Sequence, residues 1–291
     1  MANSFFVGCG YVGRKVAQQE RQDGGCVGAL VRRIESAKSL QREGIEAISI
    51  DLDQPSSLPT LDLTGRTLYW FAPPPLHGTK DPRIESLLSS IELTALPSRI
   101  ILISTTGVYG DCDGAWINES QPLCPKTARA RRRVSAEKVI EHWGHQTGVT
   151  TVILRVPGIY GPDRLPIARL KRREPVLTPD QSPWSNRIHV EDLVRVCITA
   201  ARMSDPALVY NVSDGHPSTM AEFFFEVAKS RGLPLPPMLD RQSAEKESSS
   251  KMLSYLNESK RIDNSLMRDH LGVVPNFPDL NIGLQSEINH L

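Results

Sequence analysis

The stretch Ser4-Phe-Phe-Val-Gly-Cys-Gly-Tyr-Val-Gly13 joins a short run of strand-forming residues to a glycine-rich turn. The residues that follow it, Arg14 to Glu20, form a helix-like run. A strand, a G-x-G-x-x-G turn and a helix in this order make up the phosphate-binding unit of dinucleotide-binding folds. The stretch therefore predicts a dinucleotide site, with a chance glycine-rich turn as the alternative.

Each glycine of this turn has a distinct expected role. Gly8 allows the tight turn after the strand, Gly10 lets the backbone approach the pyrophosphate, and Gly13 lets the helix pack closely on the strand. The amino end of the helix adds free N–H groups and the positive end of its dipole. The residues expected to bind phosphate are Gly8, Gly10, Tyr11, Val12 and Gly13.

Composition narrows the class of protein. The chain has 291 residues, of which 40% are hydrophobic and 23% charged, and its formal net charge is +1. These values are typical of a globular protein and indicate no general attraction to nucleic acid or membrane. No apolar run reaches the roughly 18 residues of a membrane span, and the basic run at 126–138 lacks interleaved aromatic residues. We therefore expect neither nucleic acid nor membrane as a partner.

The cysteines and the amino terminus bear on location. The first expected strand begins close to Met1, and no signal-peptide pattern precedes it. The five cysteines show no C-x-x-C or zinc-like spacing, so we expect a reduced, cytoplasmic protein without a metal site. The five cysteines are Cys9, Cys26, Cys112, Cys124 and Cys197.

Strand-like and helix-like segments alternate along most of the chain, which predicts an α/β fold with a doubly wound parallel sheet of the Rossmann type. After the first strand, we expect strands at 26–31, 45–50, 67–72, 100–103, 150–156 and 208–212, and helices at 34–43, 82–96, 126–146, 187–203 and 219–231. We expect residues 1–157 plus about 186–212 to form the dinucleotide-binding domain. About 158–185 plus 213–291 would form a smaller α+β substrate domain.

The pair Arg32 and Arg33 follows the second expected strand, where such folds place the residue that reads the ribose. An acidic residue there binds the ribose 2′-hydroxyl of NAD, whereas arginine accommodates the 2′-phosphate of NADP. Arg32 lies 19 residues after Gly13, and no Asp or Glu occurs before Glu35. We therefore expect NADP as the cofactor, with NAD as the alternative. If the two arginines have no role in cofactor binding, they are simply a solvated pair in a loop.

Other strand ends supply further candidate cofactor residues. Asp51 and Leu52 follow the third strand near the expected adenine edge, although Asp51 could equally cap a helix. Phe71, Ala72 and Pro73 follow the fourth strand. Proline there ends the ladder hydrogen bonds and stiffens the turn.

Four motifs together resemble the extended short-chain dehydrogenase/reductase superfamily, whose members include the epimerase/dehydratase-like proteins. The resemblance covers nearly the whole chain and implies a Rossmann domain with a smaller C-terminal substrate domain. The motifs are the glycine turn, Ser104-Thr-Thr-Gly-Val-Tyr-Gly110, Leu154-Arg-Val-Pro-Gly-Ile-Tyr-Gly-Pro162 and Arg187-Ile-His-Val-Glu-Asp-Leu193.

The resemblance also implies a catalytic tyrosine at position 129 and a lysine at position 133, but this chain has Arg129 and Arg133. No other Tyr-x-x-x-Lys pair replaces them nearby, so the chain resembles an atypical member. Arginine stays protonated and cannot act as the base, but it can donate paired hydrogen bonds to a carboxylate or phosphate. Thr105 matches the catalytic Ser/Thr of the family, and turn capping is its structural alternative.

Roles follow for the remaining candidates. We expect Thr105 and Tyr109 to act in catalysis, and Arg133 and Pro157 to contact the cofactor. A histidine side chain can act as a base near neutral pH, which makes His189 a candidate. The alternative for both His189 and Asp192 is a structural role. The expected substrate-binding residues are Arg129, Tyr160, Arg187 and His189.

Two functions therefore stay open. The first is an NADP(H)-preferring epimerase/dehydratase-like oxidoreductase that acts on a small, anionic substrate through a non-standard proton relay. The second is a catalytically inactive NADP(H)-binding regulator or sensor. Either protein would be a monomer or a homodimer.

Overall fold

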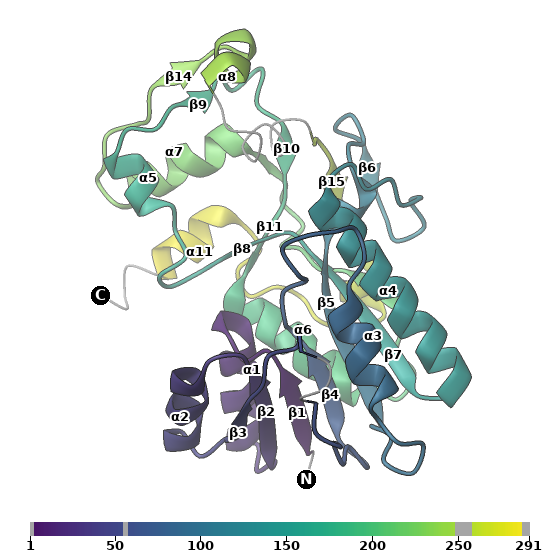
Figure 1. Ribbon diagram of the computed structural model, residues 1–291. Helices are drawn as coiled ribbons and strands as arrows, with labels where there is room; N and C mark the ends of the chain where they lie inside the picture. The colour runs from purple at the N-terminus through teal and green to yellow at the C-terminus, as the bar shows by residue number, and fades with distance from the viewer. Residues whose placement is uncertain (1–2, 55–57, 248–257, 287–291) are drawn as a thin grey trace. The chain divides into compact units, whose positions relative to one another are not determined.

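The computed structural model describes residues 3–54, 58–247 and 258–286 (Figure 1). The chain forms two compact units. The first unit comprises residues 1–108, 127–155 and 194–210, and the second comprises 109–126, 156–193 and 211–291. Compared with the expected boundaries, 109–126 and 187–193 fall in the second unit. The reason is local pairing, because a strand at 116–117 pairs with one at 261–262, and a strand at 187–189 pairs with one at 158–160.

The first unit is built on a seven-stranded sheet with the order β12-β7-β5-β4-β1-β2-β3. The ladders that join β3, β2, β1, β4 and β5 are all parallel. This confirms the predicted Rossmann-type sheet. The strands are β1 (Ser4–Val7), β2 (Val27–Val31), β3 (Glu46–Ser49), β4 (Thr67–Trp70), β5 (Arg99–Thr105), β7 (Thr150–Val156) and β12 (Val209–Asn211).

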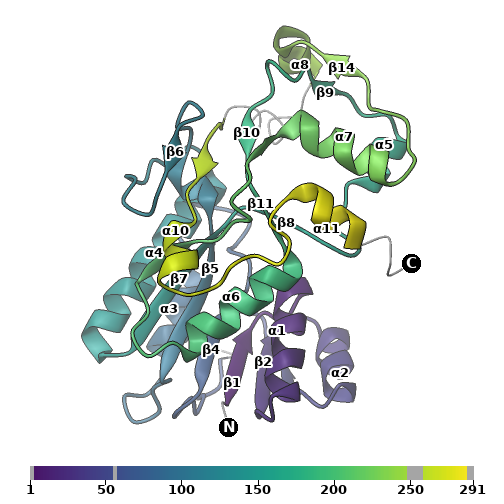
Figure 2. The same ribbon diagram turned by 180° about the vertical axis from the view of Figure 1, so that it is seen from behind.

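Helices cover both faces of this sheet. Figures 1 and 2 show α3 and α4 on one face and α1 and α6 on the other. Thr127 caps α4 by accepting a hydrogen bond from the Ala130 N–H, and Gly148 ends that helix with φ of 73°. The helices are α1 (Tyr11–Gln22), α2 (Ile34–Arg42), α3 (Pro82–Ser89), α4 (Ala128–Thr147) and α6 (Val190–Arg202).

Two helices differ from the expected bounds. The helix expected over 82–96 ends at Ser89, and the hydroxyl of Ser90 donates to the Leu87 carbonyl and closes the last turn. The helix expected from 187 begins at Val190, because 187–189 are extended and form a strand ladder instead. The apolar pattern of 187–193 is compatible with a helix and with a strand, and only pairing with a partner strand decides between the two.

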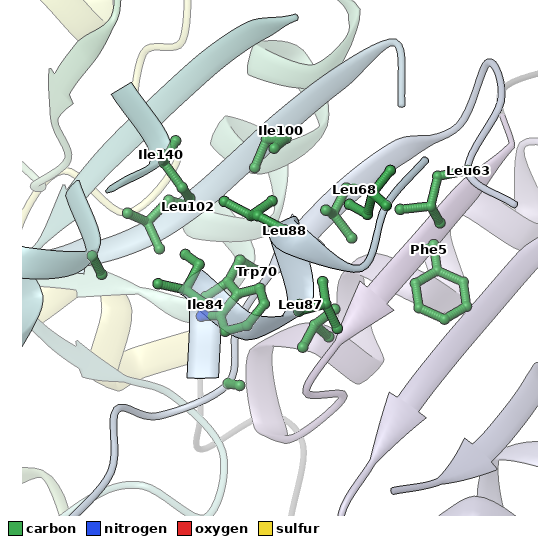
Figure 3. Close-up of a cluster of buried hydrophobic side chains, with 14 of the residues drawn as sticks. Phe5, Leu63, Leu68, Trp70, Ile84, Leu87, Leu88, Ile100, Leu102 and Ile140 are labelled. Carbon is green, nitrogen blue, oxygen red and sulfur yellow. The ribbon is translucent and has the colours of Figure 1, made fainter. Parts of the chain in front are cut away.

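The main hydrophobic core of the first unit lies between the sheet and the α3–α4 face (Figure 3). Trp70 and Leu102 point from the strands toward Ile84, Leu88 and Ile140 of the two helices. All five side chains are buried. This packing fixes α3 and α4 against the carboxyl half of the strands, where the candidate site lies.

A buried polar network also fixes α4. Arg155 of β7 donates to Glu137 of α4 at 2.9 Å, and Ser104 of β5 donates to the same carboxylate. All three side chains are buried. A carboxylate removed from water needs such partners, and losing one leaves an uncompensated charge in the interior.

Among its described residues, the second unit contains four two-stranded ladders and five helices. Helix α7 begins with a capping box in which Thr219 and Glu222 bond reciprocally. Within the described ranges, no helix is long and apolar enough to cross a membrane. The paired strands are β6 (Trp116–Ile117) with β15 (Arg261–Ile262), β8 (Gly158–Tyr160) with β11 (Arg187–His189), β9 (Val176–Leu177) with β14 (Met238–Leu239), and β10 (Trp184–Ser185) with β13 (Ser218–Thr219). The helices are α5 (Ile167–Lys171), α7 (Met220–Ser230), α8 (Arg241–Glu247), α10 (Ser265–Asp269) and α11 (Leu280–Ser286).

Replacement of Arg155 by methionine tests the buried network. Arg155→Met leaves the Glu137 carboxylate buried without its cation, so we expect a loss of about 3–5 kcal/mol in the free energy of unfolding. Lys229→Met is the matched control, because the Lys229–Glu226 pair is exposed and is worth less than about 1 kcal/mol. Urea unfolding measures both variants. An equal, small effect in the two would contradict the role of the network.

Candidate functional site

The glycine turn joins β1 to α1 as predicted, but α1 begins at Tyr11, earlier than the expected Arg14. Gly8 has φ of +86°, and a Cβ atom there would lie 2.6 Å from the backbone nitrogen of Ala72. No other residue fits this position, because both the backbone conformation and the space exclude a side chain. The turn therefore packs directly against the end of β4.

Gly10 faces open space instead. It lies immediately before α1, and a Cβ atom built there would meet no atom within 4 Å. The first bond within the helix runs from the Arg14 N–H to the Gly10 carbonyl at 2.8 Å. The N–H groups of Val12 and Gly13 precede that bond and have no acceptor in the helix itself. A space beside a glycine, at a helix amino end, fits the pyrophosphate of a dinucleotide.

The other expected cofactor residues lie at the carboxyl ends of the strands that flank β1. Arg32 and Arg33 follow β2 and are exposed. Phe71, Ala72 and Pro73 follow β4, and the Phe71 N–H donates to the Val7 carbonyl of β1. Parallel pairing puts these strand ends at one edge of the sheet, as a dinucleotide site requires.

Asp51 and Leu52 follow β3 at the same edge. The Asp51 carboxylate accepts a hydrogen bond from the Asp53 N–H at 3.1 Å, which closes a local turn. Leu52 is buried in the core. The local turn favours a structural role for Asp51, in keeping with the capping alternative.

Sequence reasoning missed one pair at this edge, Asp53 and Arg83. The Arg83 guanidinium binds both carboxylate oxygens of Asp53, at 2.7 and 2.6 Å, and donates to the Pro73 carbonyl at 2.9 Å. Arg83, followed by the more distant Arg32, holds the pKa of Asp53 below its usual range. The pair is separated by 30 residues, so no local pattern could have revealed it.

The arginines of α4 hold the loop between β4 and α3. Arg132 donates to the Gly78 carbonyl at 2.7 Å, and Arg133 reaches the Ala72 carbonyl at 3.5 Å. Burial lowers the pKa of Arg133 to about 10, while Asp81 and Glu137 oppose that shift. Arg133 therefore stays charged at neutral pH. Its guanidinium has protein partners, whereas the sequence suggested that it could bind the carboxylate or phosphate of a ligand.

Arg129 lies one turn before Arg133 on the same helix face, but its side chain is exposed. The two arginines thus lie on the same helix face but differ in their exposure to solvent. Of the expected pair, only Arg129 is open to solvent.

The two expected catalytic hydroxyls have internal partners. The Thr105 hydroxyl accepts a hydrogen bond from the Gly107 N–H at 3.2 Å, which is the turn-capping arrangement. In the second unit, Tyr109 is fully buried and its hydroxyl donates to Asn211 at 2.7 Å. This geometry favours a structural role for Tyr109, because a buried hydroxyl with a protein acceptor is not available to a substrate.

Arg187, expected to bind substrate, lies inside the second unit. It donates to the Asn186 carbonyl at 2.7 Å and lies over the Phe223 ring at 4.3 Å. Burial lowers the pKa of Arg187 to about 10, and Asp214 opposes the shift. A buried guanidinium with these contacts is first a packing element of this unit.

Tyr160 and His189, the other expected substrate residues, also lie inside the second unit. They are opposite each other in the β8–β11 ladder, and the His189 ring centroid lies 3.9 Å from that of Phe277. Both side chains are buried. Asp192 accepts backbone hydrogen bonds from Asn276 and Phe277, each at 2.9 Å. The motif at 187–193 therefore anchors the 276–277 segment, which favours the structural alternatives for His189 and Asp192.

Pro157 immediately follows β7 and separates it from β8. Its place at a strand end agrees with the expected edge of the sheet. Its contact with a cofactor stays a prediction.

The chain is similar in sequence to proteins that are already known. Residues 85–213 match the NAD dependent epimerase/dehydratase family. The chain is 28% identical to Protein YeeZ of Escherichia coli K12 over 198 residues, which cover 67% of this chain and 64% of YeeZ. The chain therefore resembles the extended short-chain dehydrogenase/reductase-like family. Its match to YeeZ spans slightly less than two thirds of that relative.

Solved structures show the same fold over nearly the whole chain. A functionally unknown conserved protein from Silicibacter pomeroyi DSS is 28% identical, with a TM-score of 0.82 and coverage of 100% of this chain and 99% of its own. UDP-glucuronic acid 4-epimerase from Bacillus cereus is 18% identical, with a TM-score of 0.76 and coverage of 99% and 98%. At that identity the second likeness concerns the fold alone.

The buried Asp214 predicts a pH dependence of stability. Burial raises the pKa of Asp214 from 3.8 to about 7, and the His216 N–H and Arg187 only partly oppose this. The folded state therefore keeps a proton that the unfolded state releases, so this carboxyl destabilises the fold as pH rises from 3.8 to about 7. Asp214→Asn removes the charge, and its stability relative to the wild type should increase through that interval and level off above it.

Urea unfolding at a series of pH values measures this difference. Asp240→Asn is the matched control, because Asp240 is exposed and its pKa is lowered by Ser243 rather than raised. The control should show no such gain. A constant difference between Asp214→Asn and the wild type across the series would contradict the raised pKa.

Proposed function

We propose that the first unit binds NADP(H) in preference to NAD(H), and that the chain is an epimerase/dehydratase-like oxidoreductase of a small substrate. The observation that carries the proposal is the glycine turn. Gly8 packs the turn on Ala72, and Gly10 leaves an open space at the amino end of α1. The similarity of residues 85–213 to the NAD dependent epimerase/dehydratase family supports a nicotinamide dinucleotide as the ligand.

Two structural relatives support a nicotinamide dinucleotide as the cofactor. UDP-glucuronic acid 4-epimerase from Bacillus cereus was captured with UDP-glucuronic acid and NAD, and MoeE5 was captured with UDP-glucose and NAD. The preference for the phosphorylated form comes from this chain itself, since Arg32 is exposed where β2 ends. A guanidinium suits a 2′-phosphate, whereas NAD binding at this place generally uses a carboxylate.

The two arginines at the relay positions imply a non-standard proton relay. Bound nicotinamide would supply the hydride acceptor or donor, as it does in this class of cofactor. Arg129 and Arg133 occupy the two relay positions that the family resemblance implies, and arginine does not release a proton near neutral pH. We assign Arg133 to the edge of the cofactor site, next to Ala72. We assign the exposed Arg129 to an anionic group of the substrate.

The second candidate function is an NADP(H)-binding regulator or sensor without turnover. It is favoured by the positions of the hydroxyls and arginines, because Thr105 caps its own turn and Arg133 stays charged. Incubation with NADP and either UDP-glucose or UDP-glucuronic acid separates the two functions. An epimerase or dehydratase of such a sugar returns the hydride to the sugar in each turnover, so its activity is measured as a new sugar nucleotide by chromatography. A sensor binds the cofactor and leaves the sugar unchanged. A cytoplasmic location stays a prediction in both cases.

Cofactor titration tests the site. NADPH should bind the wild-type protein more tightly than NADH, by about tenfold if Arg32 makes one charge-assisted contact with the 2′-phosphate. Gly10→Val should abolish binding of both dinucleotides, because its side chain fills the space expected for the pyrophosphate. Its melting temperature should stay near that of the wild type, because that side chain meets no neighbour in the structure.

Gly10→Ala provides a graded control and should bind weakly. Equal affinities of the wild type for NADPH and NADH would contradict the cofactor preference. Undiminished binding in a folded Gly10→Val protein would contradict the site itself.

The role of Arg129 can be tested with two uridine sugars. In the presence of NADP, UDP-glucuronic acid should bind about tenfold more tightly than UDP-glucose, because its carboxylate pairs with the guanidinium. Arg129→Tyr should remove this difference and should not restore a full relay. Arg131→Tyr is the matched control, because Arg131 is also exposed but lies on another face of α4. Isothermal titration measures all three proteins, and an unchanged preference in Arg129→Tyr would refute the assignment.

A further inference from the structure

The Asp53–Arg83 pair joins two strand ends at the candidate cofactor site. Asp53 lies in the turn after β3, and Arg83 lies in the first turn of α3. The guanidinium binds the carboxylate through two hydrogen bonds, at 2.7 and 2.6 Å, and a third reaches the Pro73 carbonyl. The Arg83 side chain is nearly buried, with 10% of its surface exposed, whereas 48% of the Asp53 side chain is exposed.

Arg32 lies beside the same turn. In the β2–β3 ladder Val31 is opposite Ser49, and the Ile50 N–H donates to the Val31 carbonyl at 2.9 Å. The Ser49 hydroxyl donates to the Arg32 carbonyl at 3.1 Å. The backbone of Arg32 therefore runs alongside the residues that lead into Asp53. Arg32 also contributes to the lowered pKa of Asp53, after the larger effect of Arg83.

Both arginines thus act on one carboxylate. A guanidinium and a carboxylate pair best through two parallel hydrogen bonds, and Arg83 already occupies both oxygens of Asp53. Without Arg83, Arg32 is the other cation whose charge acts on Asp53. Arg32 would then be neutralised by Asp53, and the exposed carboxylate would repel a 2′-phosphate.

We propose that Arg83 is a specificity-determining residue of the cofactor site, because it holds both oxygens of Asp53 and thereby leaves Arg32 available for a 2′-phosphate. This inference rests on the proposed NADP(H) preference. Arg83 does not touch the phosphate itself in this scheme. Its effect is confined to the distinction between the two dinucleotides, since NADH has an uncharged hydroxyl where NADPH has the 2′-phosphate.

The test compares the ratio of NADPH to NADH affinity among variants, with dinucleotide fluorescence as the readout. Arg83→Met should reduce the ratio by about tenfold, chiefly through weaker NADPH binding, because one charge-assisted contact is lost. Asp53→Asn alone should keep the wild-type ratio. The double variant Arg83→Met/Asp53→Asn should restore it, because the amide does not neutralise Arg32.

Two further variants control for stability and for the loss of a surface pair. Arg83→Lys keeps the charge but not the paired geometry, and we expect an intermediate ratio from a protein that folds like the wild type. Arg172→Met breaks an exposed arginine–carboxylate pair with Glu174 in the second unit and should leave the ratio unchanged. Melting temperatures of all variants are recorded alongside.

The outcomes separate this inference from the proposed function. A wild type without NADPH preference overturns both. A wild type that prefers NADPH, together with an unchanged ratio in Arg83→Met and Arg83→Lys, overturns only the role of Arg83. Equal losses for NADPH and NADH in these variants also overturn it, because they would show that Arg83 only positions the Pro73 loop. Failure of the double variant to recover the ratio would show that Asp53 is not the competing group.

Discussion

The close approach of Gly8 to the backbone of Ala72 is the constraint on which the candidate site depends. It brings the turn after β1 against the end of β4, with no room for a side chain between them. Around this contact, Arg133 reaches the Ala72 carbonyl and Arg83 reaches the Pro73 carbonyl. The glycine turn is thus held against the end of β4 by a steric fit, and two hydrogen bonds tie that strand end to α4 and α3, while Gly10 faces open space.

Charge in this chain is used mainly to hold its own backbone. A run of arginines in α4 suggests a binding surface when the sequence is considered alone. In the structure, Arg132 and Arg133 donate to loop carbonyls, and Arg155 neutralises Glu137 under the same helix. An arginine that stays exposed, such as Arg32 or Arg129, is a better candidate for a ligand than one that is buried or half-buried. Burial, rather than spacing, divides structural arginines from candidate binding residues.

Local patterns predicted the framework well. The aliphatic run at 100–103 and the glycine turn at 8–13 each lie where a parallel strand and its following turn were expected. The same reasoning extended α3 to residue 96 and placed a helix start at 187, because apolar spacing alone does not show where a strand partner or a capping hydroxyl intervenes. The motif at 187–193 was considered for chemistry, whereas its His189 and Asp192 pack against or bind the 276–277 segment.

The sequence by itself determined the alternation of strands and helices in the nucleotide-binding half, the glycine turn and the position of Arg32, because hydrophobic periodicity and backbone conformation are local properties. The tertiary structure alone decided which charged groups are available. Asp53 meets Arg83 across 30 residues, and Tyr109 meets Asn211 across 102. The partner of a side chain depends on the crossing of distant segments, and burial then sets its charge and its hydrogen bonds. Neither the partner of a side chain nor its burial can be deduced from the spacing of neighbouring residues.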